Sequence, residues 1–254
     1  MGTFALASTM AMAVGPALAL AIVGEGRFGL LFTVCGLLSL GALLLGLLVH
    51  YPDLRNANAR FSLAGLFERR VGWLALATAL AMSGYGAVVT FITVYAVQYR
   101  LPQPGMFYTV LSLGLVVSRV VGGRIFDRLG PRVPVLAGML CKAASLLLLG
   151  LWPSPQGFLA SAMLFGLGLG AISSSALALA VNWVPEERRG ASNATVLSAM
   201  DLGIGGGASL LGMVVQATGS YATMYVVSAA ALTVPLVLFM VKVVPGYGRL
   251  KREA

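Results

Sequence analysis

Eight long apolar runs constrain this chain more than any other feature. They cover about 3–23, 28–50, 71–98, 105–124, 133–152, 156–183, 191–217 and 221–244. About 20 apolar residues of helix cross a bilayer core about 30 Å thick, and each run is long enough to do so. Lipid offers no partner to open backbone groups, and the runs lack the alternation of a membrane barrel strand. We therefore predict an all-α integral membrane protein with about eight transmembrane helices.

The composition agrees with burial in lipid rather than in a protein core. Of the 254 residues, 59% are hydrophobic and only 10% are charged, whereas soluble domains are roughly 25% charged. The formal net charge of +9 comes from brief basic clusters between apolar runs. That pattern is typical of membrane topology signals and not of a basic binding face. We expect the lipid bilayer, and no nucleic acid, as a partner.

The basic residues fall almost entirely on alternate connections between the runs. Twelve lie on one side, namely Arg55, Arg60, Arg69, Arg70, Arg124, Arg128, Arg132, Arg188, Arg189, Arg249, Lys251 and Arg252. The opposite connections hold only Arg27 and Arg100. The positive-inside rule places the richer side in the cytoplasm. With eight spans, both termini are then cytoplasmic, and we expect a multi-pass protein of the cell (inner) membrane.

One long connection divides the chain. Segment 51–70 leaves two helices before it, in 1–50, and six after it, in 71–254. Six helices in one block are typical of the three-plus-three repeats of transporters. The sequence therefore predicts a cytoplasmic linker between two unequal domains.

The segment between the fourth and fifth runs is the most distinctive connection. It reads RVVGGRIFDRLGPR over 119–132 and has the character of a short, basic, glycine-rich turn with one acid. Gly123 and Gly130 permit close backbone approach and positive φ. Asp127 there can accept from helix N-terminal amides, and its arginines can reach neighbouring carboxylates. The alternative is a turn that only sets topology.

These residues resemble the major facilitator superfamily of secondary transporters. The stretch from Gly123 to Arg132 is similar to that family's cytoplasmic loop G-x-x-x-D-R-x-G-R-R, with Pro131 in place of the first closing basic residue. The segment PEERRGASNA at 185–194 also looks like the loop before the family's eleventh helix. The resemblance implies a latch on the cytoplasmic side, formed by Gly123, Arg124, Asp127, Arg128, Gly130 and Arg132.

A second motif resembles the antiporter branch of the same family. Gly15 and Pro16 stand where G-x-x-x-G-P-x-x-G-G has its helix kink, while Ala11, Ala19 and Leu20 replace glycines. The resemblance implies a partial general-substrate-transporter fold, with family helices five to twelve. The first domain is then the end of the N-terminal half, and 71–254 is the C-terminal six-helix half. We expect four helices to be missing ahead of Met1, through a misplaced start, a truncated gene or a separate chain, and a monomer at full length.

Asp201 is the residue in the apolar runs that most suggests function. It lies about ten residues inside the seventh helix, or roughly 15 Å from the cytoplasmic face. A carboxylate near the bilayer midplane raises the free energy of membrane insertion by at least about 3 kcal/mol, and it usually faces a partner or a water-filled cavity. We expect a proton site or a structural ion pair, with Arg119 as the first partner and Lys142 as the alternative. Arg119 and Lys142 themselves are expected to be structural, and either one could instead reach lipid headgroups.

Candidate substrate contacts come from the third and sixth helices. In the family, the helix at 71–98 lines the central cavity, so Tyr85, Phe91 and Tyr95 are candidates for contact with a lipophilic substrate. The alternative is ordinary aromatic packing or an interfacial belt, which suits Tyr95. Ser173 and Ser174 are either polar lining or contacts between helices. The glycines at 203, 205, 206 and 207, and those at 166, 168 and 170, favour close helix packing.

No catalytic constellation, zinc spacing or nucleophile elbow is present in the sequence. We therefore expect no enzyme, no metal and no cofactor. The expected function is proton-coupled efflux of small organic or drug-like molecules by alternating access, with protons as the coupling ion. The alternatives are an importer of a small metabolite by proton symport, and a non-transporting fragment that needs a missing N-terminal part.

Overall fold

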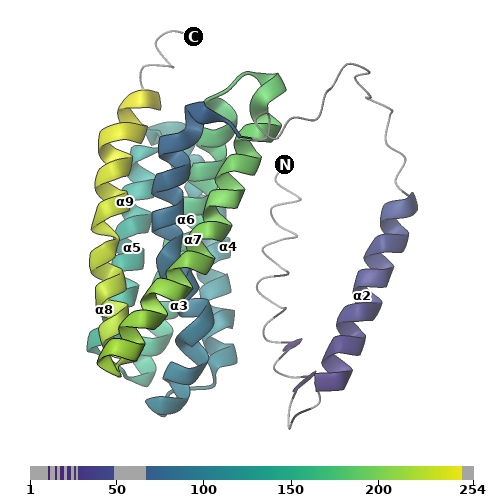
Figure 1. The fold of residues 1–254 in the computed structure, drawn as a ribbon, viewed down its shortest axis with the longest axis vertical. Coiled ribbons are helices and arrows are strands. Elements are labelled where there is room, and N and C mark those ends of the chain that lie inside the picture. The colour runs from purple at the N-terminus through teal and green to yellow at the C-terminus, as the bar shows by residue number, and fades with distance from the viewer. Residues whose placement is uncertain are drawn as a thin grey trace.

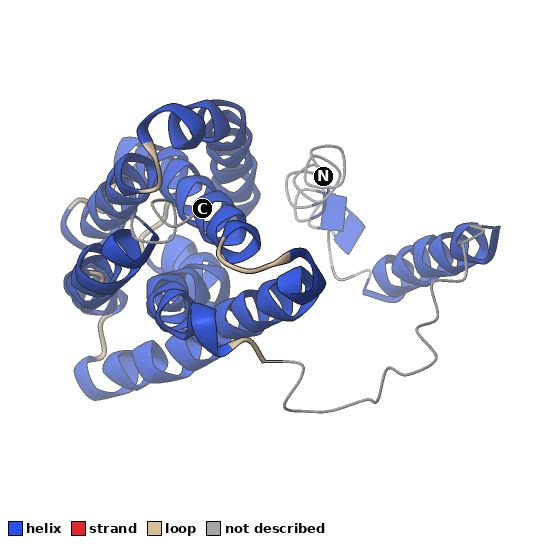
Figure 2. Ribbon diagram, turned by 90° about the horizontal axis from the view of Figure 1, so that it is seen from above, coloured by secondary structure: helices blue, strands red, loops and turns tan. Residues whose placement is uncertain are grey.

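A computed structural model describes residues 28–48 and 67–247, with isolated positions at 11, 15, 18, 19, 22, 23 and 26. Every regular element in these residues is a helix (Figure 2). They are α2 (Phe28–Leu48), η2 (Arg69–Val71), α3 (Gly72–Gln98), α4 (Pro104–Leu129), α5 (Arg132–Leu151), α6 (Pro155–Asn182), η3 (Glu186–Arg188), α7 (Arg189–Thr218), α8 (Tyr221–Ala231), α9 (Thr233–Leu238) and η4 (Phe239–Val243).

The described residues contain seven helices that are long and apolar enough to cross a membrane. They match the runs predicted from residue 28 onward, so the prediction of a helical multi-pass membrane protein is confirmed. The run at 3–23 lies outside the described residues except for isolated positions, as do Pro16 and the linker residues 51–66.

Helices α3 to α9 form one bundle in Figure 1. The main contacts are α4 on α6, α3 on α7, α5 on α6 and α5 on α8. Their interior is built from aliphatic and aromatic side chains such as Leu74, Ile92, Phe107 and Phe158. In contrast, α2 buries none of its residues.

Glycines allow the closest of these contacts. A methyl group at Gly207 would overlap the backbone of Ser83, and one at Gly203 would overlap the carbonyl of Ala79, so α7 lies directly against α3. Methyl groups at Gly166, Gly168 and Gly170 of α6 would likewise collide with α4 or α5. The predicted role in close packing is confirmed at these five positions. It is wrong for Gly205 and Gly206, which have nothing within 4 Å of an added methyl.

The segment 119–132 is not a turn but mostly the end of a helix. Helix α4 continues to Leu129, five residues beyond the predicted end, and the chain reverses only at Gly130 and Pro131. No proline interrupts the helix before that point. Gly130 has φ of +73°, a conformation that glycine adopts at little cost.

The last span covers Tyr221–Tyr247, in agreement with the run predicted over 221–244, but its helix is interrupted once. Helix α8 ends at Ala231, and α9 begins at Thr233. Pro235 has no N–H to donate to the carbonyl of Ala231, which explains the interruption. The Thr233 hydroxyl donates to the Ala230 carbonyl at 2.8 Å. A π-helical turn, η4, then completes the span.

Candidate functional site

A row of polar residues follows the exposed side of α7. Asp201 is the thirteenth of the 30 residues in this helix, about 18 Å along the axis from Arg189. Ser198, Ser209 and Gln216 are also exposed and fall on the same helical face because their spacings are close to whole turns. We call Ser198, Asp201, Ser209 and Gln216 the α7 polar face; the apolar side chains of Leu202 and Met213 are exposed beside them.

The opposite side of α7 fixes where this face points. Met200 and Leu211 are buried, and Gly203 and Gly207 lie against the backbone of α3. Asp201 is therefore turned away from the interior of the bundle. A carboxylate in contact with lipid would carry a large insertion cost, so this face is suited to water or to another protein surface.

Lys142 is not the partner of Asp201. Its side chain is fully buried on α5, where the ammonium donates to the carbonyl of Ala81 on α3. The nitrogen lies 5.1 Å from the centroid of the Phe165 ring. Both the pairing with Asp201 and a lipid-facing position for Lys142 are therefore wrong. Its predicted structural role agrees with these contacts.

Arg119 is half-buried on α4, and α4 packs chiefly on α6. An ion pair of Arg119 with Asp201 stays a prediction.

Tyr95 is a packing residue and does not line a cavity. Its side chain is fully buried, and its hydroxyl donates to the carbonyl of Leu149 at the end of α5. The ring lies 4.7 Å from that of Tyr99 and 5.2 Å from that of Tyr225, between centroids. The prediction of Tyr95 as a substrate contact is wrong, because this part of α3 faces α5 and α8, and the alternative of aromatic packing agrees with these contacts.

The other cavity candidates are half-buried. The Tyr85 ring lies 6.0 Å from Phe165 of α6, and the Phe91 ring lies 5.9 Å from Tyr221, between centroids. Ser173 and Ser174 are half-buried on α6, and the Ser173 hydroxyl points to the Gly170 carbonyl at 3.3 Å. The contact of these four residues with substrate stays a prediction.

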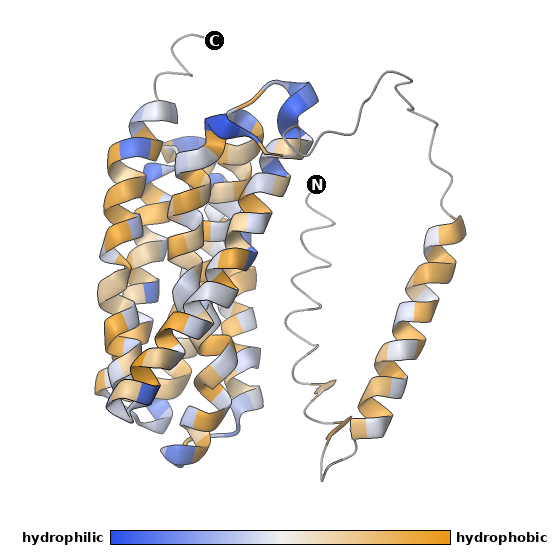
Figure 3. Ribbon diagram, in the orientation of Figure 1, coloured by the Kyte–Doolittle hydropathy of each residue, from blue (hydrophilic) through white to orange (hydrophobic). Residues whose placement is uncertain are grey.

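The predicted latch residues lie at one end of the bundle, which we call the basic end. This end carries Arg69, Arg70, Arg124, Arg128, Arg132, Arg188 and Arg189, and Figure 3 shows its polar character. Asp127 and Arg128 are exposed in the last turns of α4. A hollow of about 510 Å³ separates residues 126–132 from Asn182, Val244 and Tyr247. The motif thus borders an open space and is accessible for docking.

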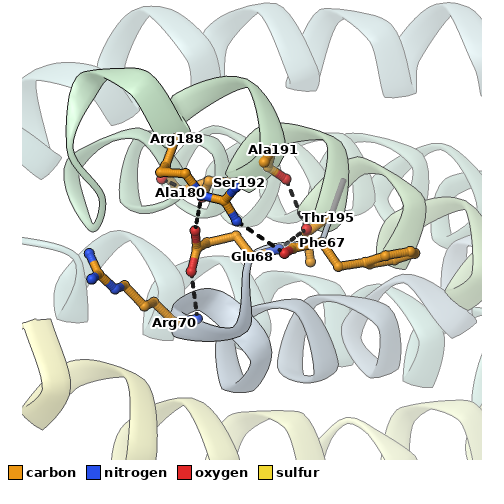
Figure 4. Close-up of polar contacts among 8 residues, drawn as sticks. All are labelled: Phe67, Glu68, Arg70, Ala180, Arg188, Ala191, Ser192 and Thr195. Carbon is orange, nitrogen blue, oxygen red and sulfur yellow. Dashed lines mark hydrogen bonds and ion pairs between the residues drawn. The ribbon is translucent and has the colours of Figure 1, made fainter. Parts of the chain in front are cut away.

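A second charged cluster at the basic end was not predicted. The Glu68 carboxylate accepts from Nε of Arg188 at 2.8 Å and from the backbone N–H of Arg70 at 3.1 Å (Figure 4). The backbone N–H of Glu68 donates to the Thr195 hydroxyl at 2.9 Å. Only 8% of the Glu68 side chain is exposed. The bond from Arg188 holds the pKa of the Glu68 carboxyl below its usual range.

Sequence reasoning missed this cluster because Glu68 and Arg188 are 120 residues apart. Both lie at membrane boundaries, and only the packing of α3 on α7 brings them together. Among the described residues, no group of three or more His, Cys, Asp or Glu side chains could hold a metal ion.

Comparison with known proteins gives the family. A family model of the Major Facilitator Superfamily matches residues 1–156 and 102–254, which together cover the whole chain. The chain belongs to the major facilitator superfamily. Members of this superfamily are membrane transporters, and the resemblance in segment 119–132 is thereby confirmed at the level of the family.

Relatives within the superfamily are longer than this chain. An MFS-type transporter of Burkholderia mallei (strain SAVP1) is 28% identical over 230 residues, which cover 91% of this chain and 54% of the relative. The MFS-type transporter YhhS of Escherichia coli (strain K12) is 27% identical over 169 residues, covering 66% and 42%. The chain thus spans about half the length of the curated relatives it matches.

Solved structures of the superfamily share the fold. The transporter FucP in its outward conformation superposes with a TM-score of 0.59 at 18% identity, over 82% of this chain and 52% of FucP. A variant of FucP, described as the fucose:proton symporter of E. coli, gives 0.58 at 18% identity, over 86% and 54%. At this identity the likeness establishes the fold of the superfamily for this chain.

Proposed function

We propose that this chain forms part of a proton-coupled secondary transporter that exports small organic or drug-like molecules by alternating access. The observation that carries the proposal is the exposed carboxylate of Asp201 on the α7 polar face, deep within a span. Membership of the major facilitator superfamily supports transport. The coupling ion, the direction and the substrate class are our proposals.

Asp201 is the residue that we assign to the proton. A carboxyl group loses its negative charge when it binds a proton. In a membrane, the charged form is costly unless it faces water or a partner, and the neutral form is less so. When charged, Asp201 favours a wet path; when neutral, it tolerates a drier contact. The glycine contacts hold α7 directly against α3, so protonation of Asp201 would act on both helices of this closely packed pair.

The substrate would meet aromatic and hydroxyl groups. Tyr85, Phe91, Ser173 and Ser174 are half-buried on α3 and α6, and they would offer a mixed surface to a lipophilic molecule with few polar groups. Export is favoured by the Gly15–Pro16 pair. The replacement of neighbouring motif glycines by Ala11, Ala19 and Leu20 favours the runner-up, an importer that uses proton symport.

The protein would lie in the inner membrane of the cell, and its basic end would face the cytoplasm. There Asp127, Arg128 and Arg132 border the hollow next to Tyr247 and would form the latch that closes this side of the transporter. The complete transporter would be a monomer in which the N-terminal half faces the α7 polar face across a water-filled path.

The test is Asp201→Asn in the transporter with its N-terminal half present. In everted vesicles, we expect substrate accumulation under a proton gradient for the parent protein, and at least about a tenfold loss of substrate-driven proton flux in the variant. Glu187→Gln is the matched control, because it removes an exposed carboxylate of η3, at the basic end and away from Asp201. Undiminished proton flux in Asp201→Asn would overturn the assignment, and accumulation in right-side-out vesicles instead would establish the importer.

A further inference from the structure

A shallow groove runs along the outer surface of the last span. It has a volume of about 420 Å³ and is lined by Thr233, Val234, Val237, Leu238, Val241 and Lys242. These residues form two adjacent rows with a spacing of four, so the groove follows the helix axis. Val234, Val237 and Val241 are each more than half exposed. Apart from Thr233 and Lys242 at its two ends, the lining is apolar.

Positive charge gathers at one end of the groove. The Lys242 ammonium lies 5.5 Å from the centroid of the Trp73 ring at the start of α3, and half of Trp73 is exposed. Arg69 and Arg70 are exposed about one turn before Trp73.

The nearest acid does not cancel this charge. The Glu68 carboxylate is bonded to Arg188 and to the backbone N–H of Arg70. In Figure 4 the side chain of Arg70 extends away from that carboxylate. The three cations Arg69, Arg70 and Lys242 therefore remain available to an anion at the membrane surface.

The length of the groove matches one leaflet. Lys242 lies nine positions after Thr233, about 14 Å along the axis, and half of a hydrocarbon core is about 15 Å thick. The groove stops where the helix is interrupted at Leu232. Tryptophan and lysine at the basic end mark the level of the headgroups.

We propose that this groove binds an anionic phospholipid. Lys242, with Arg69 and Arg70, binds the phosphate, Trp73 lies beside the glycerol region, and one acyl chain follows the valines toward Thr233. A protein helix would contact the whole length of a span, whereas this groove is one leaflet deep and is charged at one end only. The proposal does not depend on transport or on its direction.

The test measures lipid affinity of the purified 254-residue chain in detergent by native mass spectrometry. The probes are phosphatidylglycerol and phosphatidylcholine with the same acyl chains. We expect phosphatidylglycerol to bind at least about fivefold more tightly, and Lys242→Gln to remove most of that preference. Arg124→Gln is the matched control. It also removes one exposed positive charge at the basic end, but Arg124 is on α4 and does not line the groove. The preference of this variant for phosphatidylglycerol should equal that of the parent chain.

A second variant separates the groove from the charge. Val237→Trp fills the groove and keeps every cation, so it should also weaken phosphatidylglycerol binding. Equal binding of the two lipids by the parent chain would overturn the proposal. Equal losses of the phosphatidylglycerol preference in Lys242→Gln and Arg124→Gln would also overturn it, because they would indicate non-specific electrostatic attraction. Unchanged phosphatidylglycerol binding in Val237→Trp would overturn it as well. A dimer that excludes lipid from the parent chain would assign the groove to a second copy and would also overturn it.

Discussion

Glu68 connects the start of α3 to the connection between α6 and α7. Its carboxylate is held by Arg188 and by the amide of Arg70, and its own amide bonds Thr195. Charge-assisted hydrogen bonds of this kind are roughly twice as strong as neutral ones. This one residue therefore ties three segments together at the basic end, just outside the span that begins at Arg69.

The Glu68 bond predicts a pH dependence of stability. Arg188 lowers the native pKa of Glu68 below the ordinary value of 4.5. The bond therefore stabilises the fold above that pH, and this contribution is lost as the pH falls through the native pKa. We expect Glu68→Gln to lower the free energy of unfolding by about 1–3 kcal/mol at neutral pH.

Thermal unfolding in detergent across the pH range measures this effect. The difference between the parent chain and Glu68→Gln should shrink once the pH falls below 4.5. Glu187→Gln, at an exposed site, should unfold like the parent throughout. A Glu68→Gln deficit that is independent of pH would show that the carboxylate charge does not act through this bond.

The sequence predicts how deep a residue lies in the membrane, but it does not predict the side of the helix to which its side chain points. Asp201 stands out in the sequence because a carboxylate within an apolar run is rare, and in the structure it is exposed on α7. Lys142 lies at a similar depth, but it points into the bundle, because α5 is covered by α3 and α6 at that level. Direction depends on which helices pack together, and a single chain of apolar runs does not specify that.

The contact between α3 and α7 is the most constrained relation between two helices. Gly203 and Gly207 of α7 and Gly86 of α3 leave no room for a methyl group. Backbones brought this close gain van der Waals contact, which substitutes in lipid for a hydrophobic driving force. The contact also orients the α7 polar face.

This contact predicts opposite effects for two neighbouring substitutions. Gly207→Ala should destabilise the fold by about 1–3 kcal/mol, because the methyl group overlaps the backbone of Ser83. Gly206→Ala has open space and should be neutral or stabilising by up to about 1 kcal/mol through helix propensity. Unfolding in detergent measures both. Equal effects would mean that the two helices are not held at this distance.

Helix positions were predictable to within a few residues, but their irregularities were not. The bilayer requirement of about 20 apolar residues located α3, α5, α6 and α7. It failed at the end of α4, where charged residues continue a helix beyond the apolar run, and at Leu232, where Pro235 interrupts it. Both failures arise because hydropathy reports burial in lipid and not backbone hydrogen bonding.

At the scale of the molecule, the bundle has a buried apolar interior and carries the exposed α7 polar face on its outer side. The fold class followed from the number of apolar runs, and the family followed from the spacing of Gly123, Asp127, Arg128 and Gly130. The pairing of α4 with α6 and of α3 with α7 joins helices distant in sequence, and periodicity alone did not predict it. The α7 polar face is the side of the bundle to which we assign the transport function.

The role proposed for Asp201 requires that the α7 polar face borders water. Single cysteines at Ser198→Cys and Ser209→Cys, in a Cys35→Ala, Cys141→Ala background, test it with a membrane-impermeant thiol reagent. Leu140→Cys is the control, because Leu140 is exposed on α5 within an apolar stretch. We expect labelling at least about tenfold faster at both α7 cysteines, since only a hydrated thiol ionises and reacts. Labelling as slow as that of Leu140→Cys would contradict it.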